Sequence, residues 1–298
     1  LKDPKARALI DNFAGQWLYS RTVDDLKPDP TMFPKFDAPL KAAIRQETEM
    51  LFKEIAFSGA PATELLSAKY TFLNDRLAQH YGLPAVGSTE LKKTNVEAKR
   101  GGYLGHASVL TFTSHPTSTS PALRGIWVMT DLLCEEIPPP PPGIDTSLPT
   151  SMTGATLRER LESHRNNPLC SSCHKLMDPI GFGFENYDPV GAYRTTDNGK
   201  EIDASGEYLD GTKFSGLRQL AEKLAADPRF SACMTEKLYT YALGRTPVTN
   251  ITGHMDPSTI EVLSAGFRKN GFSFESLVQS MVATDTFLKR RGEAGGAP

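Results

Sequence analysis

The sequence predicts a mainly α protein, with helical domains and one short β-hairpin. Several segments place apolar residues at intervals of three and four, the spacing of one buried helical face. The pair Ser120–Pro121 is typical of a helix start, and Gly59 and Gly244 are typical of helix ends. An Asp210–Gly211 turn between short β-prone runs predicts the hairpin.

Residues 1–92 are expected to form a helical N-terminal domain. The first helix has apolar residues along one face: Ala6, Leu9, Ile10, Phe13, Trp17 and Leu18. A second helix begins at Asp37, with Pro39 in its first turn, and ends at Gly59. A third covers residues 72–81 and ends at Gly82.

Residues 93–206 form the predicted middle domain. Residues 101–120 are rich in Gly, Ser and Thr, which is typical of irregular structure. Helices are expected from Ser120 to about Cys134 and over residues 156–164. Between them, residues 138–142 are all proline and require a stiff polyproline II segment, either a linker or a strap across the surface.

Residues 207–298 contain the hairpin, over residues 207–214, and a C-terminal helical domain. One helix ends at Gly244, and two more cover residues 258–267 and 275–288. The helix that ends at Gly244 has five residues on its inner face: Phe230, Cys233, Met234, Leu238 and Tyr241.

Charge and hydropathy exclude two classes of partner. The formal net charge is −2, and no block of like charge indicates a nucleic-acid surface. No apolar run reaches the 18 or so residues that span a bilayer. The chain begins at Leu1, so we expect that a leader has been removed or that the chain is part of a longer protein.

The segment Cys170-Ser171-Ser172-Cys173-His174 carries the chemistry of the chain. Its Cys-x-x-Cys-His spacing is typical of covalent attachment of a c-type haem. The two cysteines lie about one helical turn apart, so both sulfurs reach the two vinyl groups, and His174 then binds the iron as an axial ligand. We predict one covalent haem c with the helical domains around it. The pair Asp178–Pro179 is expected to end this helix.

Other uses of the cysteine pair fit less well. A zinc site would need a second Cys/His pair at close spacing, whereas Cys134 and Cys233 are isolated. A thioredoxin-like redox pair expects a preceding strand, and a helix is predicted there instead. A buried pair without function is the remaining alternative.

The residues around the motif also carry a resemblance. The longest run continues from the motif as Met177-Asp178-Pro179-Ile180-Gly181-Phe182 and then Glu185-Asn186-Tyr187-Asp188. With Arg124-Gly125, the proline run and Tyr241-Ala242-Leu243-Gly244-Arg245, it resembles the planctomycete-type cytochrome c family. Members are typically large, secreted multidomain proteins of poorly defined function. The resemblance implies a haem, and it implies that this chain is the C-terminal part of such a protein.

The second axial ligand of the iron is left open. Met177 follows His174 by one turn on the same side, so we expect it to pack against the haem edge. The candidates are His115 and His106, which lie in residues 101–120, and His164, which precedes the motif. His164 is also suited to capping its helix end, and the other two to ordinary surface positions.

Haem propionates need basic partners, and Arg124 is assigned to this role. Lys175, Arg194 and Arg245 are alternatives. Because c-type attachment takes place outside the cytoplasm, where thiols oxidise, we expect Cys134 and Cys233 to form a disulfide. The alternative is two buried thiols. The predicted location is periplasmic or extracellular.

The expected function is single-electron transfer to or from a partner protein or domain by an extracytoplasmic monohaem cytochrome. One alternative is a haem enzyme of peroxidase type with an open distal site, which would need acid–base groups beside the iron. Another is a binding or structural module that haem holds together. The state of the second axial position separates these functions.

Overall fold

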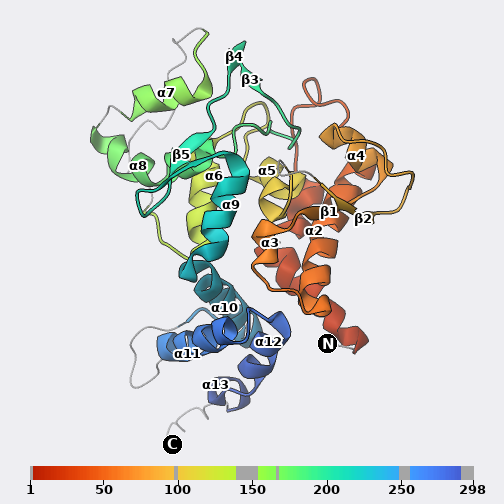
Figure 1. Cartoon of the computed structure of the whole chain (residues 1–298), viewed down its shortest axis with the longest axis vertical. Coiled ribbons are helices and arrows are strands. Elements are labelled where there is room, and N and C mark those ends of the chain that lie inside the picture. Colours follow the sequence, from red (N-terminus) through yellow and green to blue (C-terminus); the bar gives the residue numbers. More distant parts are fainter. Residues whose placement is uncertain (1–2, 97–99, 139–153, 166–167, 248–255, 290–298) are drawn as a thin grey trace, which may run out of the picture.

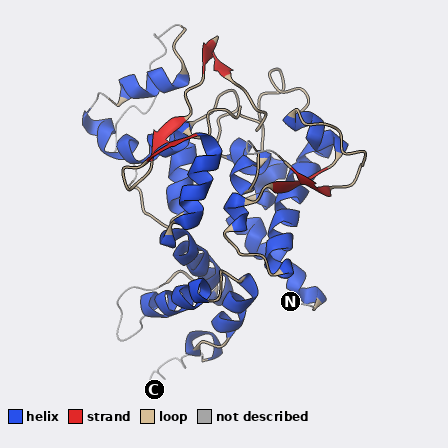
Figure 2. Cartoon of the chain, viewed as in Figure 1, coloured by secondary structure: helices blue, strands red, loops and turns tan. Residues whose placement is uncertain are grey.

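The computed structural model describes residues 3–96, 100–138, 154–165, 168–247 and 256–289 (Figure 1). The described chain is mainly helical, as predicted, with short paired strands (Figure 2). The helices are α1 (Gly15–Trp17), α2 (Ala38–Ser58), α3 (Glu64–Ser67), α4 (Asp75–Tyr81), α5 (Ala107–Phe112), α6 (Pro121–Trp127), α7 (Leu157–His164), α8 (Pro168–Phe182), α9 (Gly216–Ala226), α10 (Pro228–Leu243), α11 (Asp256–Lys269), α12 (Phe274–Val282) and α13 (Asp285–Leu288). The strands are β1 (Tyr70–Leu73), β2 (Lys92–Asn95), β3 (Thr196–Asp197), β4 (Lys200–Glu201), β5 (Ser205–Glu207) and β6 (Lys213–Ser215). A π-helical segment, Val128–Leu132, extends α6.

The strands form three antiparallel pairs, β1–β2, β3–β4 and β5–β6. The predicted hairpin is β5–β6, in which Glu207 lies opposite Lys213. The other two pairs were not predicted. Asn198 and Gly199 join β3 to β4, both with positive φ (49° and 79°), which is the two-residue turn that suits a twisted hairpin.

Helix ends agree with the sequence where one side chain decides them. The Asp37 side chain accepts a hydrogen bond from the Leu40 N–H at 2.9 Å, and Gly59 ends α2 with φ of 81°. The predicted start of the third helix at residue 72 is wrong. Residues 70–73 pair with β2, and α4 begins only after Asn74, whose side chain accepts from the Leu77 N–H.

Residues 101–120 are not irregular throughout, because α5 and a 3₁₀ turn at Tyr103–Gly105 are buried there. The small residues allow close packing of the backbone. A Cβ at Gly101 or Gly102 would collide with the backbone carbonyls of Ala68 and Leu66. Two further corrections lie near the C-terminus: α9 was not predicted, and the 275–288 segment is two helices.

One hydrophobic core runs through all three predicted domains. Phe13 packs on Phe52 (ring centroids 5.9 Å apart), on Tyr241 (5.5 Å) and on Phe274 (6.1 Å). The core also includes buried Trp127 and Phe184 from the middle of the chain, as well as many aliphatic residues. The first helices therefore pack against the last ones, as Figure 1 shows for α2 and α12.

Cys134 and Cys233 form a disulfide, as predicted, with Cα atoms 5.2 Å apart. The bridge joins the end of the α6 extension to α10. In the part of the chain that the structure describes, no helix is both long and apolar enough to cross a membrane. Residues 139–142 of the predicted polyproline segment lie outside the described residues.

Candidate functional site

Helix α8 carries the whole Cys-x-x-Cys-His motif. Pro168 is the first residue of α8. An N–H at this position has no acceptor within the helix, so proline costs no helical hydrogen bond there. The expected stop at Asp178–Pro179 is wrong, because α8 continues to Phe182. Pro179 removes one helical hydrogen bond, and the complete burial of Ile180 and Phe182 (0% and 1% exposed) offsets that loss.

The backbone of α8 places the motif residues on one side of the helix. Cys170, Cys173 and His174 stand at positions i, i+3 and i+4, which are neighbours on a helical surface. Two thiols and an imidazole on one side of a helix are the donor set that a c-type haem needs. The residues present therefore fit the predicted group.

A buried carboxylate orients His174. Its Nδ1 lies 3.0 Å from Oδ1 and 3.1 Å from Oδ2 of Asp178, one helical turn further on. Asp178 is fully buried, whereas the His174 side chain is 18% exposed. A carboxylate at Nδ1 assigns the proton to that nitrogen and leaves the lone pair on Nε2. Metal-binding histidines are typically held in this way.

Helices α8 and α6 are in backbone contact. A Cβ at Gly125 would collide with the backbone carbonyl of Met177, and one at Gly181 would collide with that of Pro121. Two glycines on facing helices thus let the backbones meet and hold the motif helix against α6. Met177, predicted to line the haem, is 5% exposed and has its carbonyl against this contact.

Of the three histidines predicted as second ligands, the structure brings His164 to His174. Their ring centroids lie 5.2 Å apart, with the ring planes at 73°. His164 is the last residue of α7, whose N-terminus is fixed by a capping box between Thr156 and Glu159. The end of α7 therefore places a second imidazole beside the motif.

The structure does not bring the other two histidines to the motif. His115 is an exposed loop residue. His106 is fully buried between α2 and β1, where Nδ1 lies 3.1 Å from the Thr48 hydroxyl and Nε2 lies 3.2 Å from that of Thr71. Burial lowers the pKa of His106 to about 3, so its ring is neutral inside this network.

Arg124 has a structural use that the sequence did not reveal. It is fully buried and donates to the carbonyl oxygens of Phe184 (2.8 Å), Tyr187 (3.0 Å) and Asp188 (3.1 Å). Its guanidinium also lies 3.5 Å from the Glu185 carboxylate, although burial still lowers its pKa to about 10. Arg124 thus fixes the turn after α8, which leaves its predicted contact with a propionate without support.

The main residue that the sequence reasoning missed is Asp178, which the sequence predicts only as part of a helix stop. The signal was available, because His174 and Asp178 are four residues apart and meet on any continuous helix. The glycine contact between α6 and α8 could not be found in this way, since it joins residues far apart in the sequence.

Three family models match successive parts of the chain. Each is described as a protein of unknown function: DUF1592 over residues 1–83, DUF1588 over residues 100–197 and DUF1585 over residues 210–287. The motif helix lies in the part that is similar to DUF1588. Each range falls within one of the three predicted domains, whose boundaries stay a prediction. No curated protein and no solved structure matches the chain.

Proposed function

We propose that this chain is an extracytoplasmic monohaem c-type cytochrome that passes single electrons to or from a partner protein or domain. Cys170 and Cys173 hold the haem through thioether bonds, and His174 binds the iron through Nε2. The bound haem supplies a one-electron iron couple. The observation that carries the proposal is the contact of the buried Asp178 carboxylate with His174 Nδ1, next to a Cys-x-x-Cys pair on the same helix.

His164 is the second axial ligand in this proposal. Its ring centroid lies 5.2 Å from that of His174, so the end of α7 has to move outward slightly for an iron to enter between the two imidazoles. Two histidine ligands give six-coordinate, low-spin iron, which suits electron transfer and leaves no open position for peroxide.

Two observations support the extracytoplasmic location. The Cys134–Cys233 disulfide is typical of proteins in oxidising compartments. The resemblance of the motif region to planctomycete-type cytochromes c implies secretion as well.

The first experiment tests haem attachment. The chain is produced in a bacterial host that matures c-type cytochromes, and haem is stained on a denaturing gel, where only covalently bound haem remains. The wild type should stain, and the double variant Cys170→Ala/Cys173→Ala should not. The variant Ser171→Ala/Ser172→Ala keeps both thiols and should stain fully. An unstained wild type would overturn the proposal.

The second experiment tests the axial ligands by electron paramagnetic resonance of the ferric protein. The wild type should be low-spin and inert to hydrogen peroxide. His164→Ala should become high-spin, whereas His115→Ala, at an exposed histidine away from the motif, should leave the spectrum unchanged. A low-spin His164→Ala would refute the assignment of His164. High-spin, peroxide-reactive wild type would favour the peroxidase alternative over electron transfer.

A further inference from the structure

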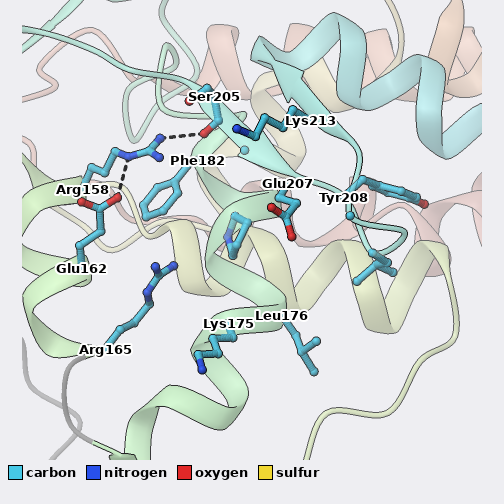
Figure 3. A pocket seen from close by; sticks show the side chains of 14 residues that line it. Arg158, Glu162, Arg165, Lys175, Leu176, Phe182, Ser205, Glu207, Tyr208 and Lys213 are labelled. Atoms are coloured by element: carbon cyan, nitrogen blue, oxygen red, sulfur yellow. Dashed lines mark hydrogen bonds and ion pairs between the residues drawn. The ribbon is translucent and has the colours of Figure 1, made fainter.

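A pocket of about 480 Å³ lies between α7, α8 and the β5–β6 hairpin (Figure 3). It does not share the face of α8 that carries His174 and Asp178. Lys175, Pro179 and Phe182 of α8 line the pocket. Lys175 and Pro179 each follow His174 and Asp178 by one residue, and successive residues of a helix are rotated by about 100° around its axis. The pocket is therefore a second feature of the same helix.

At the inner end of the pocket, Arg158 is held by two carboxylates and a carbonyl oxygen. The Arg158 guanidinium stacks 4.3 Å from the centre of the Phe182 ring. It is held there by the Glu162 carboxylate at 2.9 Å and by the Ser205 carbonyl oxygen at 2.7 Å. Asp203 lies 3.3 Å away as well. The two carboxylates thus offset the charge of Arg158, and its side chain forms one side of the pocket.

The rim is positively charged without such compensation. Arg165 and Lys175 lie on the side of α7 and α8, and Lys213 lies on the hairpin (Figure 3). Among the described residues, none of these three cations has a carboxylate within 4.0 Å. One carboxylate on the rim, Glu207, faces Lys213 across the hairpin. Three cations against one anion leave a net positive rim on a chain whose net charge is −2.

The walls beside these cations are apolar. Pro179 and Phe182 come from α8, and Leu209 comes from the hairpin. Leu176 is 50% exposed at the edge. The lining of the pocket is therefore about half apolar and half polar, which places an apolar surface beside convergent charged groups.

We propose that this pocket binds a small organic anion. Its carboxylate or phosphate group contacts Arg165 and Lys175, and its ring-sized apolar body packs against Pro179 and the neighbouring walls. Lys213 adds to the positive potential from the opposite side. The residues of α8 that line the pocket lie on a different face from His174 and Asp178.

The test is isothermal titration calorimetry of the full chain, matured with its haem, with phenyl phosphate as the probe. Phenyl phosphate should bind, and the double variant Arg165→Gln/Lys175→Gln should bind it more weakly by roughly tenfold or more, because two charge-assisted contacts are lost. Lys53→Gln removes one charge from an exposed position of α2 and should leave binding unchanged. Haem content, read from the absorption spectrum, should be equal in all variants.

Two further titrations separate the parts of the proposal. Inorganic phosphate should bind more weakly than phenyl phosphate, and added salt should weaken both. Equal binding of the two anions would overturn the role of the apolar walls. No binding of phenyl phosphate, or equal binding by wild type and the double variant, would overturn the site while leaving the haem proposal intact.

Discussion

The buried carboxyl group of Glu47 should make the stability of the protein depend on pH. Its carboxyl group lies on α2 inside the N-terminal part of the core and is fully buried. The hydroxyl groups of Thr71 and Tyr81 donate to its two oxygens, each at 2.6 Å. His106 Nε2 lies 3.7 Å away. Substitution of Glu47 by Gln keeps the size of the side chain and removes its ionisation.

Burial raises the pKa of Glu47 from its ordinary value of 4.5 to about 7, although both hydroxyl contacts oppose the shift. A raised carboxyl pKa means that the folded state holds its proton more tightly. The resulting stability is present below pH 4.5 and is lost as the pH rises through about 7. The difference between these pKa values corresponds to about 3 kcal/mol in the free energy of unfolding.

His106 has the opposite effect. Because burial lowers its pKa from 6.5 to about 3, its contribution is lost as the pH falls from 6.5 towards 3. Between pH 4.5 and 6.5, Glu47 lowers the free energy of unfolding as the pH rises, and His106 raises it. The two effects cancel in this range. In Glu47→Gln only the contribution of His106 remains. The free energy of unfolding of this variant should therefore fall steadily as the pH falls below 6.5.

The assay is denaturant unfolding followed by circular dichroism at several pH values from 4 to 8. The free energy of unfolding of Glu47→Gln relative to the wild type should rise by about 3 kcal/mol between pH 4.5 and 8, whatever the packing cost of the substitution. Glu54→Gln makes the same chemical change on α2 in a partly exposed ion pair with Lys93, and it controls for the substitution itself. Parallel curves for wild type and Glu47→Gln would refute the reasoning.

Three further predictions concern the motif helix and the disulfide. Gly125→Ala should lower the free energy of unfolding by about 1–3 kcal/mol in urea, because its Cβ collides with the Met177 carbonyl. Cys134→Ala/Cys233→Ala should lower it by up to about 4–5 kcal/mol, the loop-closure value for a sequence separation of 99 residues. In the proposed haem protein, Asp178→Asn should make the reduction potential more positive in spectroelectrochemistry, since a negative charge beside a histidine ligand favours ferric iron.

Matched controls accompany these variants. Gly266→Ala adds a Cβ to α11 where nothing lies within 4 Å, so the stability of this variant should be equal to or above that of the wild type. Equal losses for Gly125→Ala and Gly266→Ala would contradict the close contact of α6 and α8. A potential unchanged by Asp178→Asn would contradict the carboxylate contact with His174.

The elements that the sequence predicted well have their ends set by nearby residues. Asp37 and Gly59 bound α2, and Thr156 begins α7, because a cap needs only its own backbone neighbours. Residues 101–120 were misjudged for the opposite reason. Their glycines allow close approach to a distant part of the chain, and composition alone does not separate that use from a mobile loop. The Asn198–Gly199 turn was a local signal that went unused.

The donor set of the proposed haem site can be predicted from the sequence alone. Cys170, Cys173 and His174 are neighbours on any helix, because the distances within one or two turns depend only on local backbone geometry. The same geometry sets Asp178 beside His174. Which distant groups join them depends on how the separate elements pack together. The tertiary structure placed His164 beside His174 and buried His106 and Arg124 in other networks, since contacts between separate elements depend on how the whole core packs.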